Sequence, residues 1–209
     1  MSTRAPADTR DRILDAACDV IAEHGIEDVR IARIATIAGV SPALVHYHFE
    51  TREALLAEAL EHSFELLGNV RRLADGGEHW SALRKLAWMV DQSLPFPGMG
   101  EREWNLWLEL WRRAARTRDL QPIAAQLYER YDAWIAEAVQ EAVDNGELPA
   151  CDVRAVTQRL IARIDGLGLR VLVADPEMPL ERARELALGG LAEELGIGVE
   201  EFGPEGGSR

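Results

Sequence analysis

The stretch IARIATIAGVSPALVHYHF, residues 31–49, decides the fold. Its first half has the spacing of a short amphipathic helix and ends at Gly39, a residue that readily closes a helix. Ser41 and Pro42 then supply an N-cap and a first-turn proline for a second short helix over residues 42–48. Two short helices joined by a tight turn form a helix-turn-helix, whose second helix lies in the major groove of DNA. The stretch therefore predicts a DNA-reading element.

The side chains of this stretch divide into an inner and an outer set. The inner set is apolar and is expected to form a small core between the helices: Ile31, Ile34, Ala35, Ile37, Val40, Leu44 and Val45. The outer set is expected to face solvent or DNA: Arg33, Thr36, Ser41, Pro42, Ala43, His46, Tyr47 and His48. Phe49, at the end of the second helix, is assigned to the core.

Helical periodicity continues on both sides of this stretch. Residues 9–24 place apolar side chains on one face and stop at Gly25, and Thr51 can cap a long helix over residues 52–73. Glycine and proline breaks then separate five more helical segments. These cover about residues 78–93, 101–118, 122–144, 152–174 and 180–195. Without any strand pattern, the sequence predicts an all-α fold of about nine helices.

Composition limits the class of protein. Among 209 residues, 47% are hydrophobic and 28% are charged, as in ordinary globular domains. Apolar runs stay well below the roughly 20 residues of a membrane-spanning helix, and the N-terminus does not resemble a signal peptide, so we expect a cytoplasmic protein without membrane contact. Cys18 and Cys151 have no partner at metal-ligand spacing. Neither a metal nor a cofactor is expected.

The charge balance argues against nonspecific binding of nucleic acid. The net charge is −13, and acidic residues outnumber arginines even within residues 1–62. Affinity for DNA backbone comes from neutralising phosphates, which an acidic surface opposes. Any DNA binding must therefore come from a local face of the molecule.

The N-terminal sequence resembles the TetR family of bacterial transcription regulators. The resemblance rests on Arg12–Ala17, Gly25, Ile34-Ala35, Ala38–Ser41, Leu44–Phe49, Thr51–Glu53 and Leu55. These matches follow one another in order over about residues 10–60. Arg30 departs from the pattern, because the family often has Ser or Thr at the start of the second helix, where it can cap.

The resemblance implies roles for matching positions. Arg33 would face base edges, where arginine can bind guanine with two hydrogen bonds. The exposed side of the recognition helix would read the groove, and residues around the start of the next helix would hold phosphates. The candidate DNA-binding residues are Arg33, Ser41, Pro42, Ala43, His46, Tyr47, His48, Thr51 and Arg52.

Aromatic residues characterise the rest of the chain. All six tryptophans follow residue 60, and Trp104, Trp107 and Trp111 share one helix face. Such aromatics either pack a core or line an apolar ligand pocket, where Glu109 or Asp165 would suit a cationic effector. The region over residues 78–195 also resembles the sensor domains of betaine-operon-type TetR regulators. The candidate ligand-binding residues are Trp88, Trp104, Trp107, Trp111, Tyr128, Tyr131, Trp134 and Asp165.

The last two predicted helices have broad apolar faces that must be buried. The resemblance implies that they pack against the same two helices of a second chain, related by twofold symmetry. Burial within one chain is the alternative. The candidate interface residues are Leu160, Ile164, Leu167, Gly168, Val171, Leu188, Leu191 and Leu195. A homodimer would place two helix-turn-helix domains, called reading heads below, on the two half-sites of a palindromic operator.

These features predict a division into a helix-turn-helix domain over residues 1–55, a ligand-binding and dimerisation domain over 56–198, and a disordered tail over 199–209. The expected function is a ligand-released transcriptional repressor, with no catalysis. One alternative is a DNA-binding adaptor controlled by a protein partner. Another is a small helical enzyme, which the lack of a catalytic triad, metal cluster or phosphate-binding loop disfavours.

Overall fold

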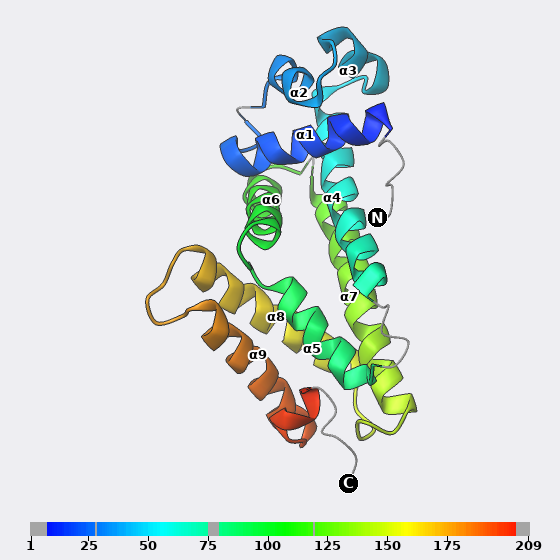
Figure 1. Ribbon diagram of the computed structural model, residues 1–209, viewed down its shortest axis with the longest axis vertical. Helices are drawn as coiled ribbons and strands as arrows, with labels where there is room; N and C mark the ends of the chain where they lie inside the picture. The colour runs from blue at the N-terminus through cyan, green and yellow to red at the C-terminus, as the bar shows by residue number, and fades with distance from the viewer. Residues whose placement is uncertain (1–7, 28, 75–79, 119, 204–209) are drawn as a thin grey trace, which may run out of the picture. The chain divides into compact units, whose positions relative to one another are not determined.

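The computed structural model describes residues 8–27, 29–74, 80–118 and 120–203, and this part of the chain is helical (Figure 1). It contains α1 (Thr9–His24), α2 (Ile31–Ala38), α3 (Pro42–His48), α4 (Arg52–Ala74), α5 (Ala82–Ser93), α6 (Met99–Arg116), α7 (Gln121–Asp144), α8 (Val153–Leu172), α9 (Leu180–Leu195) and a final 3-10 helix η1 (Val199–Phe202). The described residues form no strand. The prediction of an all-α fold of about nine helices is confirmed.

The chain packs as two compact units that do not follow the order of the sequence. The first unit combines Met1–Leu73 with Arg102–Leu127, and the second combines Ala74–Glu101 with Tyr128–Arg209. The first therefore holds α1 to α3, most of α4 and α6, and the beginning of α7. The predicted division at residue 55 separates sequence segments, whereas packing groups α6 with the N-terminal helices.

The core of the first unit is built around α1. Ile13, Ala17 and Ile21 lie four residues apart on one face of α1 and are fully buried. Leu106 and Leu110 of α6 belong to the same continuous core and have 2% and 0% of their surface exposed. Because these side chains come from distant parts of the chain, α6 completes the core around the reading head.

The helix-turn-helix is held by local hydrogen bonds that the sequence predicts. The Ser41 hydroxyl accepts from the backbone N–H of Leu44 at 3.2 Å, so it caps α3. Gly39 closes α2 in the left-handed conformation, with φ of 66°. Arg12 of α1 donates to the carbonyl of Ala38, which fixes the C-terminus of α2 against α1. These contacts set the angle between the two short helices.

Ile37 differs from the prediction that it lies in the head core. Its side chain is 50% exposed, whereas Ile34, Ala35 and Ala38 of the same helix are buried. A helix of two turns buries one face only, and these three residues already occupy the face of α2 that packs on α1.

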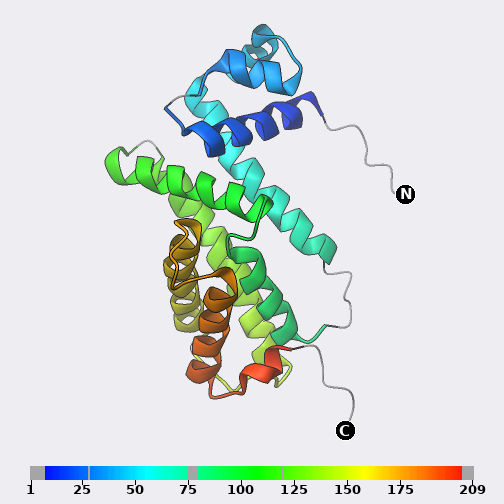
Figure 2. The same cartoon turned by 60° about the vertical axis from the view of Figure 1, so that its left-hand side comes forward.

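The second unit is built from α5, α8, α9 and the later part of α7 (Figure 2). Helices α8 and α9 form an extensive contact within the chain, and α5 packs against both. Gly190 of α9 lets the Arg163 side chain of α8 pass closely, since a Cβ atom there would lie 2.8 Å from Arg163 Cζ. Gly190 thus serves packing within one chain, whereas a Cβ atom on Gly189 would meet nothing within 4 Å.

The end of the chain also differs from the prediction. Val199–Phe202 forms a 3-10 helix, and Phe202 is 4% exposed. Burial of this phenylalanine, in an element that contacts α5 and α9, orders residues that by composition suggest a disordered tail. Residues 204–209 lie outside the described part of the chain.

Thr157 of α8 is a buried polar residue whose replacement we expect to stabilise the protein. It is 2% exposed, and its hydroxyl makes no hydrogen bond within the part of the chain that the structure describes. Because a buried unpaired hydroxyl costs about 1–3 kcal/mol, we expect Thr157→Val to raise the free energy of unfolding by about 1 kcal/mol. Thermal and urea unfolding measure this change.

Thr157→Ser is the matched control, because it keeps the hydroxyl and removes only the methyl group. We expect it to lower stability through the lost apolar contact. A lower melting temperature for Thr157→Val than for the parent protein would show that the hydroxyl has a partner, such as a buried water molecule.

Candidate DNA-reading and effector sites

Helix α3 presents one face outward. Val45 is fully buried, while Ser41, Pro42, Ala43 and His46 are exposed. Tyr47 has 81% of its surface exposed. A large aromatic residue held this far out of the core has no role in packing the head. Its hydroxyl is available to a phosphate oxygen, as the sequence predicts.

Arg33 extends from the exposed face of α2. Its side chain is 48% exposed, and its guanidinium lies 3.8 Å from the Glu23 carboxylate. A pair at this distance on the surface restrains Arg33 little. The surrounding hollow is lined by His24, Arg30, Ala32, Arg33 and Thr36. Its ionisable side chains are basic, so this is a local cationic face on an acidic protein.

The other predicted DNA contacts have mixed surroundings. The Thr51 hydroxyl accepts from the N–H of Ala54 at 3.0 Å, so it caps α4 and retains its own O–H as a donor. His48 is half-buried and meets Tyr47 edge to face, with ring centroids 5.4 Å apart. The side chain of Arg52 lies outside the described part of the chain.

Three predicted ligand residues cluster on α6 in the first unit. Trp104 meets Trp111 edge to face at 6.0 Å, and Trp107 lies 5.8 Å from Trp111. Trp104 is 6% exposed, and the other two are half-buried. Trp107 also lines a small cavity of about 10 Å³, which is about the size of one water molecule. Trp104 and Trp111 are not among the residues that line it.

The cavity in the first unit contains a buried carboxylate. Its lining residues are Leu60, Ser63, Phe64, Glu103, Leu106, Trp107, Leu110 and Leu127. Glu103 is 7% exposed and lies four residues from Trp107, on the same helix face. Glu103 is not among the ligand residues predicted from the sequence. Its spacing from Trp107 was the available signal, but only tertiary packing shows that this glutamate points inward.

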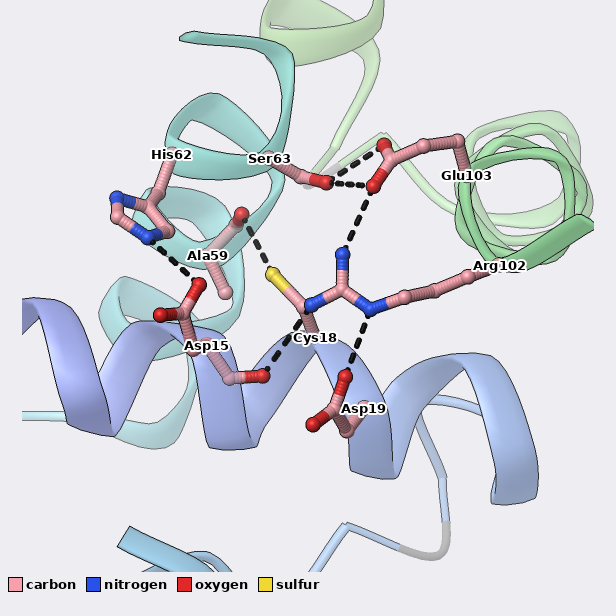
Figure 3. A network of polar contacts seen from close by, with 8 residues as sticks. All are labelled: Asp15, Cys18, Asp19, Ala59, His62, Ser63, Arg102 and Glu103. Carbon is pink, nitrogen blue, oxygen red and sulfur yellow. Dashed lines mark hydrogen bonds and ion pairs between the residues drawn. The ribbon is translucent and has the colours of Figure 1, made fainter. Parts of the chain in front are cut away.

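A polar network surrounds Glu103 where α1, α4 and α6 meet (Figure 3). The Ser63 hydroxyl lies 2.5 Å from both carboxylate oxygens of Glu103. Arg102 donates from Nη1 to Glu103 at 2.8 Å and from Nε to Asp19 at 2.7 Å. The Cys18 thiol donates to the carbonyl of Ala59 at 3.0 Å. This network joins three helices through side chains that converge from each of them.

Glu109, which the sequence suggested as a carboxylate for a ligand, has a different role. Its Oε2 accepts from the backbone N–H of Ile26 at 3.1 Å, and Arg112 donates to the same oxygen at 3.0 Å. Arg112 also pairs with Glu27 at 3.1 Å, and the hydrogen bond from Arg112 lowers the pKa of Glu27. Glu109 therefore fixes the loop between α1 and α2.

The remaining predicted ligand residues lie in the second unit. Tyr128 donates to Asp165 at 2.9 Å, and Tyr131 stacks on Trp134 with centroids 6.1 Å apart. Trp88 of α5 is half-buried. Burial raises the pKa of Asp165 to about 6. The hydrogen bond from Tyr128 lowers this pKa in part, and the charge of Asp132 adds a smaller increase. The predicted ligand residues thus divide between the two compact units.

The raised pKa of Asp165 predicts a pH dependence of stability. Because the folded carboxyl binds its proton more tightly than the unfolded one, stability falls as pH rises from about 4 towards and through about 6. Asp165→Asn removes this titration while its amide oxygen still accepts from Tyr128. We therefore expect the variant to have a higher melting temperature than the parent at pH 7.5. At pH 4.5 this increase in melting temperature should be smaller.

Differential scanning calorimetry across this pH range measures the effect. Asp132→Asn, on α7, is the control, because Asp132 is only a minor contributor to the Asp165 shift. An equal change for Asp165→Asn at both pH values would contradict the raised pKa.

Five of the predicted dimer residues are buried within a single chain. Leu160, Ile164, Leu188, Leu191 and Leu195 are 0%, 1%, 2%, 0% and 6% exposed. With so little exposed surface, these five side chains pack mainly within the chain, between α8, α9 and α5, and their part in a dimer interface stays a prediction. Gly168 is also buried, whereas Leu167 and Val171 are half-buried. Near the end of α8, Leu169 and Val173 are 41% and 65% exposed.

Two further observations concern other kinds of site. Among residues 8–27, 29–74, 80–118 and 120–203, His, Cys, Asp and Glu side chains nowhere gather in groups of three that could hold a metal ion. Over the same residues, no helix is both long and apolar enough to cross a membrane.

Comparison with known proteins identifies the family. Residues 13–59 match the family model of bacterial regulatory proteins of the tetR family, and residues 82–196 match that of the C-terminal domain of BetI-type transcriptional repressors. The HTH-type transcriptional regulator BetI 1 of Chromohalobacter salexigens is 29% identical over 188 residues, which cover 89% of this chain and 90% of the relative.

Solved structures agree with this assignment. A transcriptional regulator from Saccharomonospora viridis in complex with choline is 30% identical, with a TM-score of 0.76, over 88% of this chain and 95% of that one. A TetR-family regulator from Rhodococcus sp. is 29% identical, with a TM-score of 0.79, over 90% and 98%. The chain therefore belongs to the TetR family of DNA-binding transcriptional regulators, with a BetI-type C-terminal domain.

Proposed function

We propose that the protein is a homodimeric repressor that leaves a palindromic operator when a small cationic effector binds in the first unit. The observation that carries the effector proposal is the buried carboxylate of Glu103 on the wall of a cavity shared with Trp107 and Phe64. A buried negative charge beside aromatic rings suits an ammonium group, which gains from both the carboxylate and the ring faces.

The chemistry of this cavity favours a quaternary ammonium compound such as choline. Leu60, Leu106, Leu110 and Leu127 supply apolar surface for methyl groups, and Glu103 supplies the counter-charge. The cavity, of about 10 Å³, has to widen to admit such a ligand. The similar regulator from Saccharomonospora viridis was solved with choline, which supports the same class of effector here.

The DNA-reading role is proposed for the exposed side of α2 and α3. Arg33 reads base edges, and the outward side chains of α3 contact the major groove. Tyr47, His48, Thr51 and Arg52 hold phosphates on either side, which fixes the register of the head. Together they concentrate positive and hydrogen-bonding groups on one face, so that a protein of net charge −13 can still bind DNA.

Dimerisation is proposed through the faces of α8 and α9 that remain open. Leu169 of α8 and Val173, the residue that follows this helix, are large apolar residues exposed four positions apart. An exposed apolar surface on a helix pair is a typical site for a twofold contact.

Binding of choline and release of DNA test the proposal together. We expect choline to raise the melting temperature of the protein and to weaken its binding to DNA from upstream of its own gene, at a stated salt concentration. Glu103→Gln should lose both responses. Glu129→Gln, which removes an exposed carboxylate from α7, should keep them.

The outcomes separate the parts of the proposal. Specific DNA binding that choline and related amines leave unchanged would reject the cationic effector and favour control by a protein partner. A response that survives in Glu103→Gln would move the effector site away from this cavity.

A further inference from the structure

We infer that Arg102 transmits effector binding to the reading head, because an effector cation at Glu103 competes with Arg102 for the same carboxylate. This inference rests on the proposed cationic effector. The Arg102 guanidinium forms an ion pair with Glu103, at 2.8 Å. The same guanidinium holds α6 to α1. Binding of a second cation therefore weakens a contact with the head.

The guanidinium of Arg102 contacts Glu103 on its own helix, α6, and two acceptors on α1 (Figure 3). Nη1 donates to Glu103, Nε donates to Asp19 at 2.7 Å, and Nη2 donates to the backbone carbonyl of Asp15 at 3.4 Å. Because the guanidinium is planar, its bond to Glu103 orients the other two donors towards α1. Glu103 thus controls how well α6 is held against α1.

Glu103 depends on a positive partner. It is 7% exposed, and leaving a buried carboxylate without a counter-charge costs several kcal/mol. Ser63 of α4 donates to it from a distance of 2.5 Å but carries no charge. Arg102 forms an ion pair with Glu103, and 24% of the Arg102 side chain is exposed. It can therefore turn towards water when another cation enters the cavity.

When Arg102 is no longer paired with Glu103, its contacts with α1 become weaker. Asp19 has 55% of its side chain exposed, so the remaining Arg102–Asp19 contact becomes a surface ion pair, which contributes little when its geometry is not fixed. Helix α1 packs directly on α2, which carries Arg33. A looser α6–α1 contact therefore changes how firmly the reading helices are held.

The contact between α1 and α4 does not depend on Arg102. The Cys18 thiol donates to the Ala59 carbonyl, and burial raises the pKa of this thiol to about 12, so it stays neutral. His62 of α4 lies 3.1 Å from Asp15 of α1. The effect of the effector is therefore directed at the contact between α6 and α1.

Arg102→Met tests the inference, because methionine keeps an unbranched apolar stem and removes the charge. Calorimetry gives the dissociation constant of choline, and fluorescence anisotropy gives that of operator DNA with and without choline. We expect choline to bind several-fold more tightly to Arg102→Met, because its competitor is gone. The ratio of DNA dissociation constants with and without choline should fall from the range of about 5 to 150 towards 1.

Two further variants separate transmission from stability. Asp19→Ala removes the side-chain acceptor of Arg102 on α1 and leaves Glu103 paired, so choline affinity should stay unchanged while the ratio falls. Arg118→Met removes an exposed arginine that lies between α6 and α7, and should change neither quantity. A purely structural role for Arg102 would lower the melting temperature without tightening choline binding.

Each outcome decides the inference. Weaker choline binding by Arg102→Met, or an unchanged ratio, would overturn it while leaving the proposed function intact. If the parent protein does not bind choline at millimolar concentration, the effector proposal fails. The inference is then decided by whether the Arg102→Met variant binds choline. Binding gained in that variant supports competition at Glu103, and no binding in either protein overturns it.

Discussion

Arg33→Ala is expected to weaken operator binding by about tenfold to a hundredfold, because a bidentate contact between arginine and guanine contributes about 1–3 kcal/mol of discrimination. The side chain is 48% exposed, and its nearest charged partner, Glu23, lies 3.8 Å away. Removing it therefore leaves the core of the head intact, and the melting temperature should not change. The loss should appear on operator DNA and be much smaller on unrelated DNA.

Electrophoretic mobility shift or anisotropy titrations at several salt concentrations measure this effect. Arg33→Lys keeps the charge but not the planar fork, so it should restore only part of the affinity. Arg118→Ala, at an exposed position between α6 and α7, is the control for loss of one positive charge. Equal losses on operator and unrelated DNA, with a salt slope reduced by about 1, would instead make Arg33 a phosphate contact.

The double variant Leu169→Glu, Val173→Glu is expected to dissociate the dimer at micromolar concentration and to weaken operator binding at least about a hundredfold. These residues are 41% and 65% exposed and lie four positions apart at the C-terminal end of α8. Twofold symmetry would place four new carboxylates in one apolar contact, where each unpaired charge costs several kcal/mol. A monomer binds a single half-site, so the affinity of two linked heads is lost.

Sedimentation or light scattering shows the oligomeric state, and circular dichroism shows that the chain remains folded. Val199→Glu is the control, because Val199 is 52% exposed but lies in η1. A double variant that remains dimeric would place the interface on another surface. A control that dissociates would extend the interface to η1.

The features that the sequence predicts well are those that depend on neighbouring residues. Ser41 caps α3 through a hydrogen bond three residues along the chain, and Gly39 closes α2 through its own backbone angles. Short-range chemistry of this kind gives the helix boundaries and the reading head to within a few residues. The exposed face of α3 follows from the same spacing, since burial of Val45 fixes the opposite side.

The features that the sequence predicts poorly depend on which element covers which. An apolar face on α8 or α9 shows that something buries it, but not whether the cover comes from α5 or from a second chain. Leu160 and Leu191 are buried within one chain for this reason, although their pattern also suits a dimer. Glu103 and Glu109 lie on the same helix, and only long-range packing shows that one faces a cavity and the other a loop.

The continuous core that joins Leu106, Leu110, Leu120 and Leu127 to α1 and α2 has a consequence for protein engineering. Chimeric regulators are made by exchanging recognition segments between proteins, with the junction chosen from the order of the sequence. A cut near residue 55 would transplant the reading helices without the leucines of α6 and α7 that enclose them. The segment to exchange is therefore discontinuous, and a functional chimera of this protein requires compatible residues at 102–127 as well as at the N-terminus.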